Sequence, residues 1–250
     1  MIKKILFILN SLIISNIFLL CSDDNGMEIQ NGGNLPRTIS FSGFEWTVNS
    51  SGSSRINPGQ NFFSCSEENV WVDLKGNLHL KITNRNGIWY CAAVTLKESH
   101  AFNKFVFYVS SRVDKFDKNV IGGLFTYLDD SNEIDIEFGK WGAEENMNSQ
   151  FVVQPSYQSG NIYRYAMSLI GDNSTHIIDW KKGLIDFASY HGHYSTRPNS
   201  EKIISEWSYT GKYLPSEVKE KIMINLWLFE GRPPSDNKEV EMIVKAFEIY

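Results

Sequence analysis

Short runs in which apolar and polar residues alternate dominate the chain from Thr38 onward. Residues 70–74 and 78–82 alternate on either side of a Lys-Gly-Asn turn, and residues 105–109 and 133–138 alternate in the same way. Because successive side chains of a strand point to opposite faces, each run predicts a half-buried β-strand, and the first two predict a hairpin. The same reasoning predicts further strands at residues 122–128, 150–154, 176–180, 184–189, 222–228 and 240–250, and a helical turn only at residues 216–221.

The number and spacing of these runs indicate the fold class. Many short strands separated by turns are typical of an antiparallel β-sandwich or barrel. Residues 38–250 contain no second linker and no repeat, so we expect a single all-β domain. A hydrophobic content of 42% is sufficient for a substantial core. With 24 basic and 29 acidic residues and no strongly basic run, the sequence gives no electrostatic support for nucleic-acid binding.

The first 21 residues follow a different pattern. Lys3 and Lys4 precede an apolar run at residues 5–20, which is shorter than the about 20 residues that a membrane-spanning helix needs and fits an export signal. The run ends in Leu-Leu-Cys, which resembles a bacterial lipobox with Cys21 as the lipidated residue, although Leu20 stands where a small residue is usual. An uncleaved anchor is the alternative. Residues 22–37 are polar and rich in Gly and Asn, as in a flexible tether.

The chemistry of the chain is concentrated in residues 133–138, Glu-Ile-Asp-Ile-Glu-Phe. Alternation places Glu133, Asp135 and Glu137 on one face of a strand and the apolar residues on the core face. Such a strand can be an ordinary one with a solvated acidic face. However, like charges raise the pKa of at least one member, and a protonated acid beside an ionised carboxylate suits retaining glycoside hydrolysis. The Cα atoms of Glu133 and Glu137 would be about 13 Å apart, so their side chains must lean together over Asp135.

This hexapeptide resembles the active-site strand of glycoside hydrolase family 16, which includes laminarinases and lichenases. Residues 175–187 are similar to the family's His-x-x-x-Trp hairpin, residues 225–227 to its Asn-Leu-Trp strand, and residues 68–73 and 76–80 to its N-terminal strands. The resemblance covers roughly residues 41–250. It implies a concanavalin A-like β-jelly roll, in which two curved antiparallel sheets form a concave cleft for a polysaccharide.

The resemblance also implies a role for each residue that matches the motif. Glu133 corresponds to the nucleophile, Glu137 to the general acid/base, and Asp135 to the residue that shares their proton network. Substrate-binding roles are expected for Trp141, Gln154, Asn225 and Trp227, with core packing as the alternative for each tryptophan. No cofactor and no metal ion is expected, because His191 and His193 are read as part of a polar loop rather than half of a metal site.

Two departures from the family pattern concern the substrate cleft. Family members often carry Glu in the strand equivalent to residues 92–94, and a Tyr-Gly pair near residues 101–103; here the Glu is absent and Asn103 stands where Gly is common. Both positions border the cleft in relatives. The departures therefore put the substrate preference in question more than the chemistry.

The remaining expectations concern the cysteines and the cellular location. In an exported protein Cys65 and Cys91 form an even pair that a disulfide can join, with two separate buried thiols as the alternative. The sequence as a whole predicts a monomeric endo-acting β-glycan hydrolase, lipid-anchored at the bacterial cell envelope or secreted if the lipobox is not used. The alternatives are a catalytically silent glycan-binding module and a cell-wall transglycosylase on the same fold.

Overall fold

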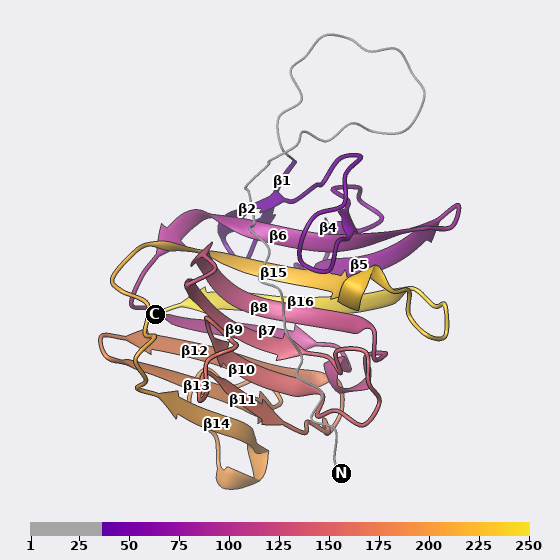
Figure 1. Ribbon diagram of the computed structural model, residues 1–250. Coiled ribbons are helices and arrows are strands. Elements are labelled where there is room, and N and C mark those ends of the chain that lie inside the picture. Colours follow the sequence, from indigo (N-terminus) through magenta and orange to yellow (C-terminus); the bar gives the residue numbers. More distant parts are fainter. Residues whose placement is uncertain (1–36) are drawn as a thin grey trace.

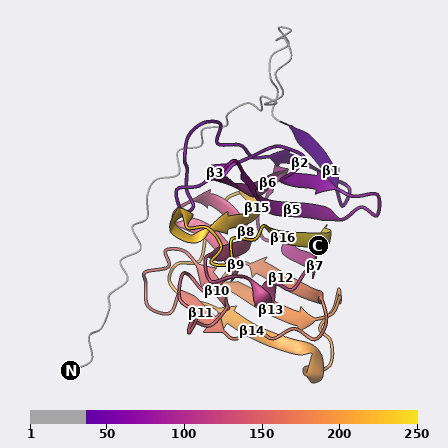
Figure 2. The same cartoon turned by 90° about the vertical axis from the view of Figure 1, so that its right-hand side faces the viewer.

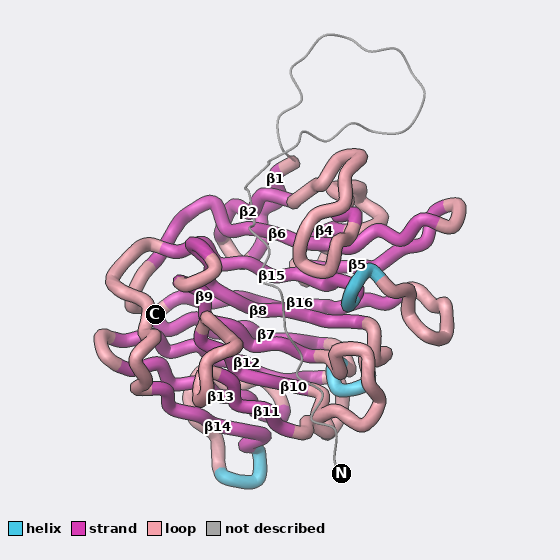
Figure 3. The backbone as a smooth tube through the Cα atoms, viewed as in Figure 1, coloured by secondary structure: helices cyan, strands magenta, loops and turns pink. Residues whose placement is uncertain are grey.

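The computed structural model describes residues 37–250. The expectations for residues 1–21 and 22–36, including lipidation of Cys21, fall outside this part of the chain. The described part is built almost entirely from strands, with three short 3₁₀ turns (Figure 3). The strands are β1 (Thr38–Phe41), β2 (Phe44–Val48), β3 (Phe62–Phe63), β4 (Val70–Val72), β5 (Leu78–Arg85), β6 (Ile88–His100), β7 (Lys104–Ser110), β8 (Val120–Asp129), β9 (Asn132–Phe138), β10 (Ser149–Val153), β11 (Ile162–Tyr165), β12 (Asn173–Lys181), β13 (Leu184–His191), β14 (Ile203–Tyr209), β15 (Glu220–Leu228) and β16 (Val240–Ile249).

The strands form two curved antiparallel layers that enclose the core (Figures 1 and 2). The first layer has the order β11-β10-β9-β8-β15-β6-β2-β1, and the second has the order β14-β13-β12-β7-β16-β5-β4. The layers are joined where β5 continues into β6 as a hairpin, with Arg85 opposite Ile88. The predicted all-β sandwich is therefore confirmed.

The core lies between the two layers and is rich in large aromatic side chains. From the first layer it receives residues such as Leu124, Ile136 and Phe138, and from the second Phe107 and Phe247, all of them fully buried. Ile136 and Phe138 occupy the positions that alternation assigned to the inner face. The apolar face of β9 packs in the core against the second sheet, and this packing fixes the position of the opposite, outward face of β9.

Several predicted local features agree with the structure. The hairpin at residues 70–82 is β4 and β5, and the run around Lys-Lys-Gly is the β12–β13 hairpin with Gly183 at φ +81°. The helical turn at residues 216–221 is wrong, because β15 begins at Glu220 and pairs there with His100 of β6. Among residues 37–250 no helix is long and apolar enough to cross a membrane.

The predicted Cys65–Cys91 disulfide is also wrong. Cys91 is a free, fully buried thiol, so it forms no bridge with Cys65. Cys91 lies on β6 opposite Phe63 of β3, and Cys65 follows after β3 has ended. The two backbones are neighbours, yet the side chains are not opposite each other, which is a condition for a disulfide.

Candidate active site

The acidic face of β9 is the centre of the candidate site (Figure 1). Ile134, Ile136 and Phe138 are fully buried in the core, so Glu133, Asp135 and Glu137 project together from the other face, as predicted. Asp135 is 5% exposed, and the two glutamates are half-buried. Three carboxyl groups with little access to water therefore share a short stretch of one strand.

Glu133 and Asp135 are joined by a hydrogen bond between their carboxyl groups. Burial raises the pKa of Glu133 to about 8, and the hydrogen bond from Asp135 opposes that rise. Burial, followed by the charges of Glu133 and Glu137, raises the pKa of Asp135 well above its ordinary value. The hydrogen bond thus favours ionisation of Glu133 over ionisation of Asp135, so a single proton shared by the pair resides preferentially on Asp135.

Glu137 is held by a separate set of side chains from the neighbouring strands. Gln150 stands directly opposite it on β10 and donates from Nε2 to Glu137 Oε2 at 2.5 Å. Arg164, opposite Gln150 on β11, donates from Nε to Gln150 Oε1 at 3.0 Å, and its guanidinium carbon lies 5.1 Å from the centre of the Trp141 ring. Burial raises the pKa of Glu137, whereas Gln150 and Arg164 lower it.

This arrangement suits a group that must change protonation state. A carboxyl group that is partly desolvated yet balanced by a donor and a cation can both give and accept a proton near neutral pH. Trp141 lies just beyond β9, at φ +45°, and is half-buried with its ring against Arg164. Trp141, a predicted substrate-binding residue, is thus linked to Glu137 through contacts with Arg164 and Gln150.

Gln154 reaches the site from the end of β10, as the sequence suggested, but it contacts a carboxyl group. Its Nε2 donates to Asp135 Oδ2 at 3.4 Å, and its Oε1 accepts from the backbone N–H of Ser156 at 2.7 Å. Its backbone N–H donates to the carbonyl of Glu133 at 3.1 Å. Gln154 therefore helps to orient Asp135.

Asn225 and Trp227 lie on β15, two strands away from the acidic strand. Asn225 is opposite Gly123 of β8, which is itself opposite Glu137 of β9. A Cβ atom at Gly123 would lie 2.5 Å from Asn225 Oδ1, so only glycine leaves room for the amide there. Asn225 Oδ1 is buried and has no hydrogen-bond partner in the described part of the chain. Trp227 is half-buried and packs partly against the core.

One of the two departures from the family pattern lies on this side of the site. Ala93 of β6 is opposite Asn225, and Thr95 is opposite Met223. Ala93 belongs to the stretch, residues 92–94, in which the family pattern leads one to expect a glutamate. Asn103 lies elsewhere, with its carbonyl accepting from the backbone N–H of Trp180.

Two residues of the site, Gln150 and Arg164, were not predicted. Their polar side chains lie in strands whose other residues are mostly apolar or aromatic, which is a weak signal without the pairing register. Once β10 is aligned with β9, the register alone puts Gln150 opposite Glu137. Within residues 37–250, no group of three or more His, Cys, Asp or Glu side chains is arranged to hold a metal ion.

Comparisons with known proteins add to this geometry. No family model matches the sequence, and no curated protein matches it. Solved structures do match. A Bacillus licheniformis β-glucanase is similar with a TM-score of 0.62 and 18% identity, over 88% of this chain and 99% of the other. A glycosyl hydrolase family 16 protein from Mycobacterium smegmatis has a TM-score of 0.58 and 14% identity, over 82% and 91% of the two chains.

A third similar structure is described as an immunostimulatory antigen and pseudo β-1,3-glucanase of Mycobacterium tuberculosis. It has a TM-score of 0.59 and 16% identity, over 82% of this chain and 90% of the other. At these identities the likeness concerns the fold. The chain therefore has the β-jelly-roll fold of the β-glucanases of glycoside hydrolase family 16.

Proposed function

We propose that this protein is a retaining glycoside hydrolase that cleaves internal β-glycosidic bonds of a polysaccharide. The observation that supports the proposal is the difference in environment among the three carboxyl groups. Glu133 and Asp135 form a buried pair in which burial and like charges raise the pKa of Asp135, while Glu137 contacts Gln150, which is bonded in turn to Arg164. Two carboxyl groups with different environments on one face are what a retaining mechanism requires.

In the first step, a carboxylate oxygen of Glu133 attacks the anomeric carbon. The bond from that carbon to the leaving oxygen breaks, and Glu137 gives its proton to this oxygen. The product is a covalent glycosyl ester on Glu133. In the second step Glu137 takes a proton from water, the water oxygen attacks the anomeric carbon, and the ester bond to Glu133 breaks. Two inversions give net retention.

The aromatic and polar side chains around the carboxyl groups fit a sugar chain. Trp141 and Trp227 offer ring faces on which the C–H face of a pyranose can pack, and the free Oδ1 of Asn225 can accept a hydroxyl proton. Ala93 and Thr95 leave more room on the β6 side than a glutamate would. The β-glucanase neighbours favour a β-glucan as the first class of substrate to test.

Purified protein lacking residues 1–21 should release reducing ends from at least one member of a panel of β-1,3-glucan, mixed-linkage β-glucan and agar. Replacing Glu133 with Gln should abolish the release while the thermal unfolding transition persists, because the isostere removes only the nucleophilic charge. Azide should restore turnover to Glu133→Ala with inverted product, since the small anion enters the space of the missing carboxylate. Wild-type activity in Glu133→Gln would contradict the assignment.

Two alternatives use the same fold. A catalytically silent glycan-binding module is favoured by the missing cleft glutamate at Ala93 and by a structural neighbour described as a pseudo β-1,3-glucanase. It predicts binding to a polysaccharide of the panel without release of reducing ends. A transglycosylase would instead form products longer than the supplied oligosaccharide.

We further propose that the protein is exported, lipid-anchored through Cys21 and monomeric. A single acyl chain binds membranes only marginally, so several chains would be needed for stable attachment. Mass spectrometry of the N-terminal peptide of the native protein should find the lipid in thioether linkage on Cys21. A Cys21 that carries no lipid would contradict the proposal.

A further inference from the structure

A groove of about 930 Å³ lies between β1 of the first layer and β4 and β5 of the second, and none of the carboxyl groups of the candidate site line it. It runs along β4 and β5, is closed at one side by β1, and has Glu239, just before β16, at the other. On β5, Leu80 and Ile82 face the core, so Lys81 and Thr83 face outward into the groove. The residues of the candidate active site do not line it.

Trp71 of β4 provides a flat apolar surface in this groove. One face of its indole is stacked on His79, with the ring centres 4.5 Å apart and the planes at 12°. His79 is fixed in turn, since its Nδ1 lies 2.9 Å from Glu241 Oε1 and its Nε2 lies 3.3 Å from Asp73 Oδ2. Trp71 is half-buried and, unlike the fully buried Trp46, does not belong to the core. Its rigid ring is therefore available to a ligand on the groove side.

The charged side chains of the groove balance one another. Three ion pairs line it: Lys81–Glu239 at 2.6 Å, Arg37–Glu67 at 3.7 Å and Arg85–Glu68 at 3.8 Å. Exposed pairs of this kind add little to stability, with a usual contribution of about 0–1 kcal/mol each. What they create is a surface with many donors and acceptors and no net charge. Such a surface suits a neutral ligand rich in hydroxyl groups better than an anion or a cation.

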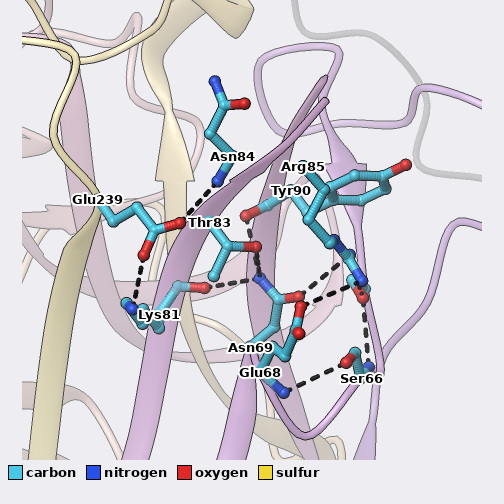
Figure 4. Close-up of polar contacts among 10 residues, drawn as sticks. Ser66, Glu68, Asn69, Lys81, Thr83, Asn84, Arg85, Tyr90 and Glu239 are labelled. Atoms are coloured by element: carbon cyan, nitrogen blue, oxygen red, sulfur yellow. Dashed lines mark hydrogen bonds and ion pairs between the residues drawn. The ribbon is translucent and has the colours of Figure 1, made fainter. Parts of the chain in front are cut away.

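The floor of the groove is held rigidly (Figure 4). Arg85 stacks over Tyr90 with its guanidinium carbon 3.9 Å from the ring centre, and its Nη2 donates to Ser64 Oγ at 2.9 Å and to Asn69 Oδ1 at 3.2 Å. The fully buried Asn69 donates to the carbonyl of Lys81 at 2.8 Å and to that of Tyr90 at 3.2 Å. A surface fixed in this way loses little conformational entropy when a ligand binds.

We propose that this groove is a second, non-catalytic binding site for a neutral glycan. The C–H face of one sugar unit packs on Trp71, and hydroxyl groups of the neighbouring units bond to side chains of the ion pairs and to the exposed Asn84. A volume of about 930 Å³ is enough for a short stretch of an oligosaccharide. Because the groove shares no lining residue with the acidic face of β9, both can engage one polymer, or two, at the same time.

The experiment is affinity electrophoresis of the full chain in gels that contain laminarin, barley mixed-linkage β-glucan or agarose. All variants carry Glu133→Gln, so that no polymer is cleaved. They also carry Trp227→Ala, so that binding at the acidic face of β9 is weakened. We compare this background with and without Trp71→Ala. Tyr250→Ala, which removes an aromatic ring that is 59% exposed and does not line the groove, is the matched control.

Trp71→Ala should raise the dissociation constant for at least one polymer about fivefold to tenfold, as expected for loss of one stacked ring, while Tyr250→Ala leaves it unchanged. Asn84→Ala, at an exposed position, should weaken binding in the same direction. Equal retardation with and without Trp71→Ala, or no retardation of the background by any of the three polymers, would overturn the proposal. Hydrolysis by the parent is measured separately, so failure of the groove leaves the proposed catalytic function untouched, and the reverse also holds.

Discussion

Replacing Gln150 with Leu is the change that most selectively tests how Glu137 is tuned. The amide of Gln150 donates to Glu137 at 2.5 Å and also accepts from Arg164, so it connects the acid/base to its only described nearby cation. Leucine is nearly the same size as glutamine, and its side chain cannot donate a hydrogen bond to Glu137. The substitution therefore removes stabilisation of the ionised form of Glu137 and raises the pKa of this carboxyl group.

The size of the effect follows from the hydrogen bond that is lost. A hydrogen bond to a charged group contributes about 1.5–3 kcal/mol, and about 1.4 kcal/mol corresponds to a factor of ten in a protonation equilibrium. Glu137 is half-buried, so solvent replaces part of this contribution. Because Glu137 must be protonated for the first step, the basic limb of the profile of kcat/KM against pH should move upward by about 1 to 2 pH units.

The assay is the pH dependence of kcat/KM on a polysaccharide that the parent cleaves, together with a ¹³C NMR titration of the labelled glutamate carboxyl groups, which needs no turnover. Arg164→Met should shift the limb in the same direction, since the cation also lowers the pKa of Glu137. Gln158→Leu, on the loop after β10, is the matched control. A basic limb that stays in place or moves to lower pH in Gln150→Leu would refute the reasoning.

Three further predictions concern stability and reactivity. Burial raises the pKa of Glu133 to about 8, so this residue favours the folded state only while it is protonated, and the free energy of unfolding falls as pH rises through about 8. Glu133→Gln should therefore unfold at a higher temperature than the parent at pH 9. Near pH 4 the two proteins should unfold at the same temperature. Gly123→Ala should lower the free energy of unfolding by about 1–3 kcal/mol in urea titrations, because its Cβ meets Asn225. Burial raises the pKa of Cys91 to about 12, so peptide mapping should find this thiol labelled by a maleimide only after denaturation. The first argument would be contradicted by the same difference in melting temperature at both pH values. The second would be contradicted by a Gly123→Ala protein with the parent's free energy of unfolding, and the third by maleimide labelling of Cys91 in the native protein.

The features that sequence reasoning found depend on local alternation. Ile134, Ile136 and Phe138 had to be buried if residues 132–138 formed a strand, and this placed the three carboxyl groups on one outer face. The hairpins around Gly76 and Gly183 were equally local, since both glycines adopt positive φ in tight turns. Such features need no knowledge of which strands are neighbours.

The features that sequence reasoning missed depend on which strands pair. The helical turn at residues 216–221 failed because pairing of β15 with β6 extends to Glu220, and tertiary contacts override a weak local preference. The Cys65–Cys91 bridge failed because closeness of two segments does not fix where their side chains point. Gln150 and Arg164 were invisible for the same reason, since their role exists only in the register of three strands.

The central claim is that Glu133 and Glu137 carry out retaining hydrolysis, and the configuration of the first product tests it most directly. ¹H NMR of the anomeric protons during the first minutes of digestion of a β-glucan should show the β-anomer appearing first and the α-anomer growing only by mutarotation. Glu133→Gln should show neither signal under the same conditions. An initial α-anomer, or β-anomer release that persists in Glu133→Gln, would contradict the account.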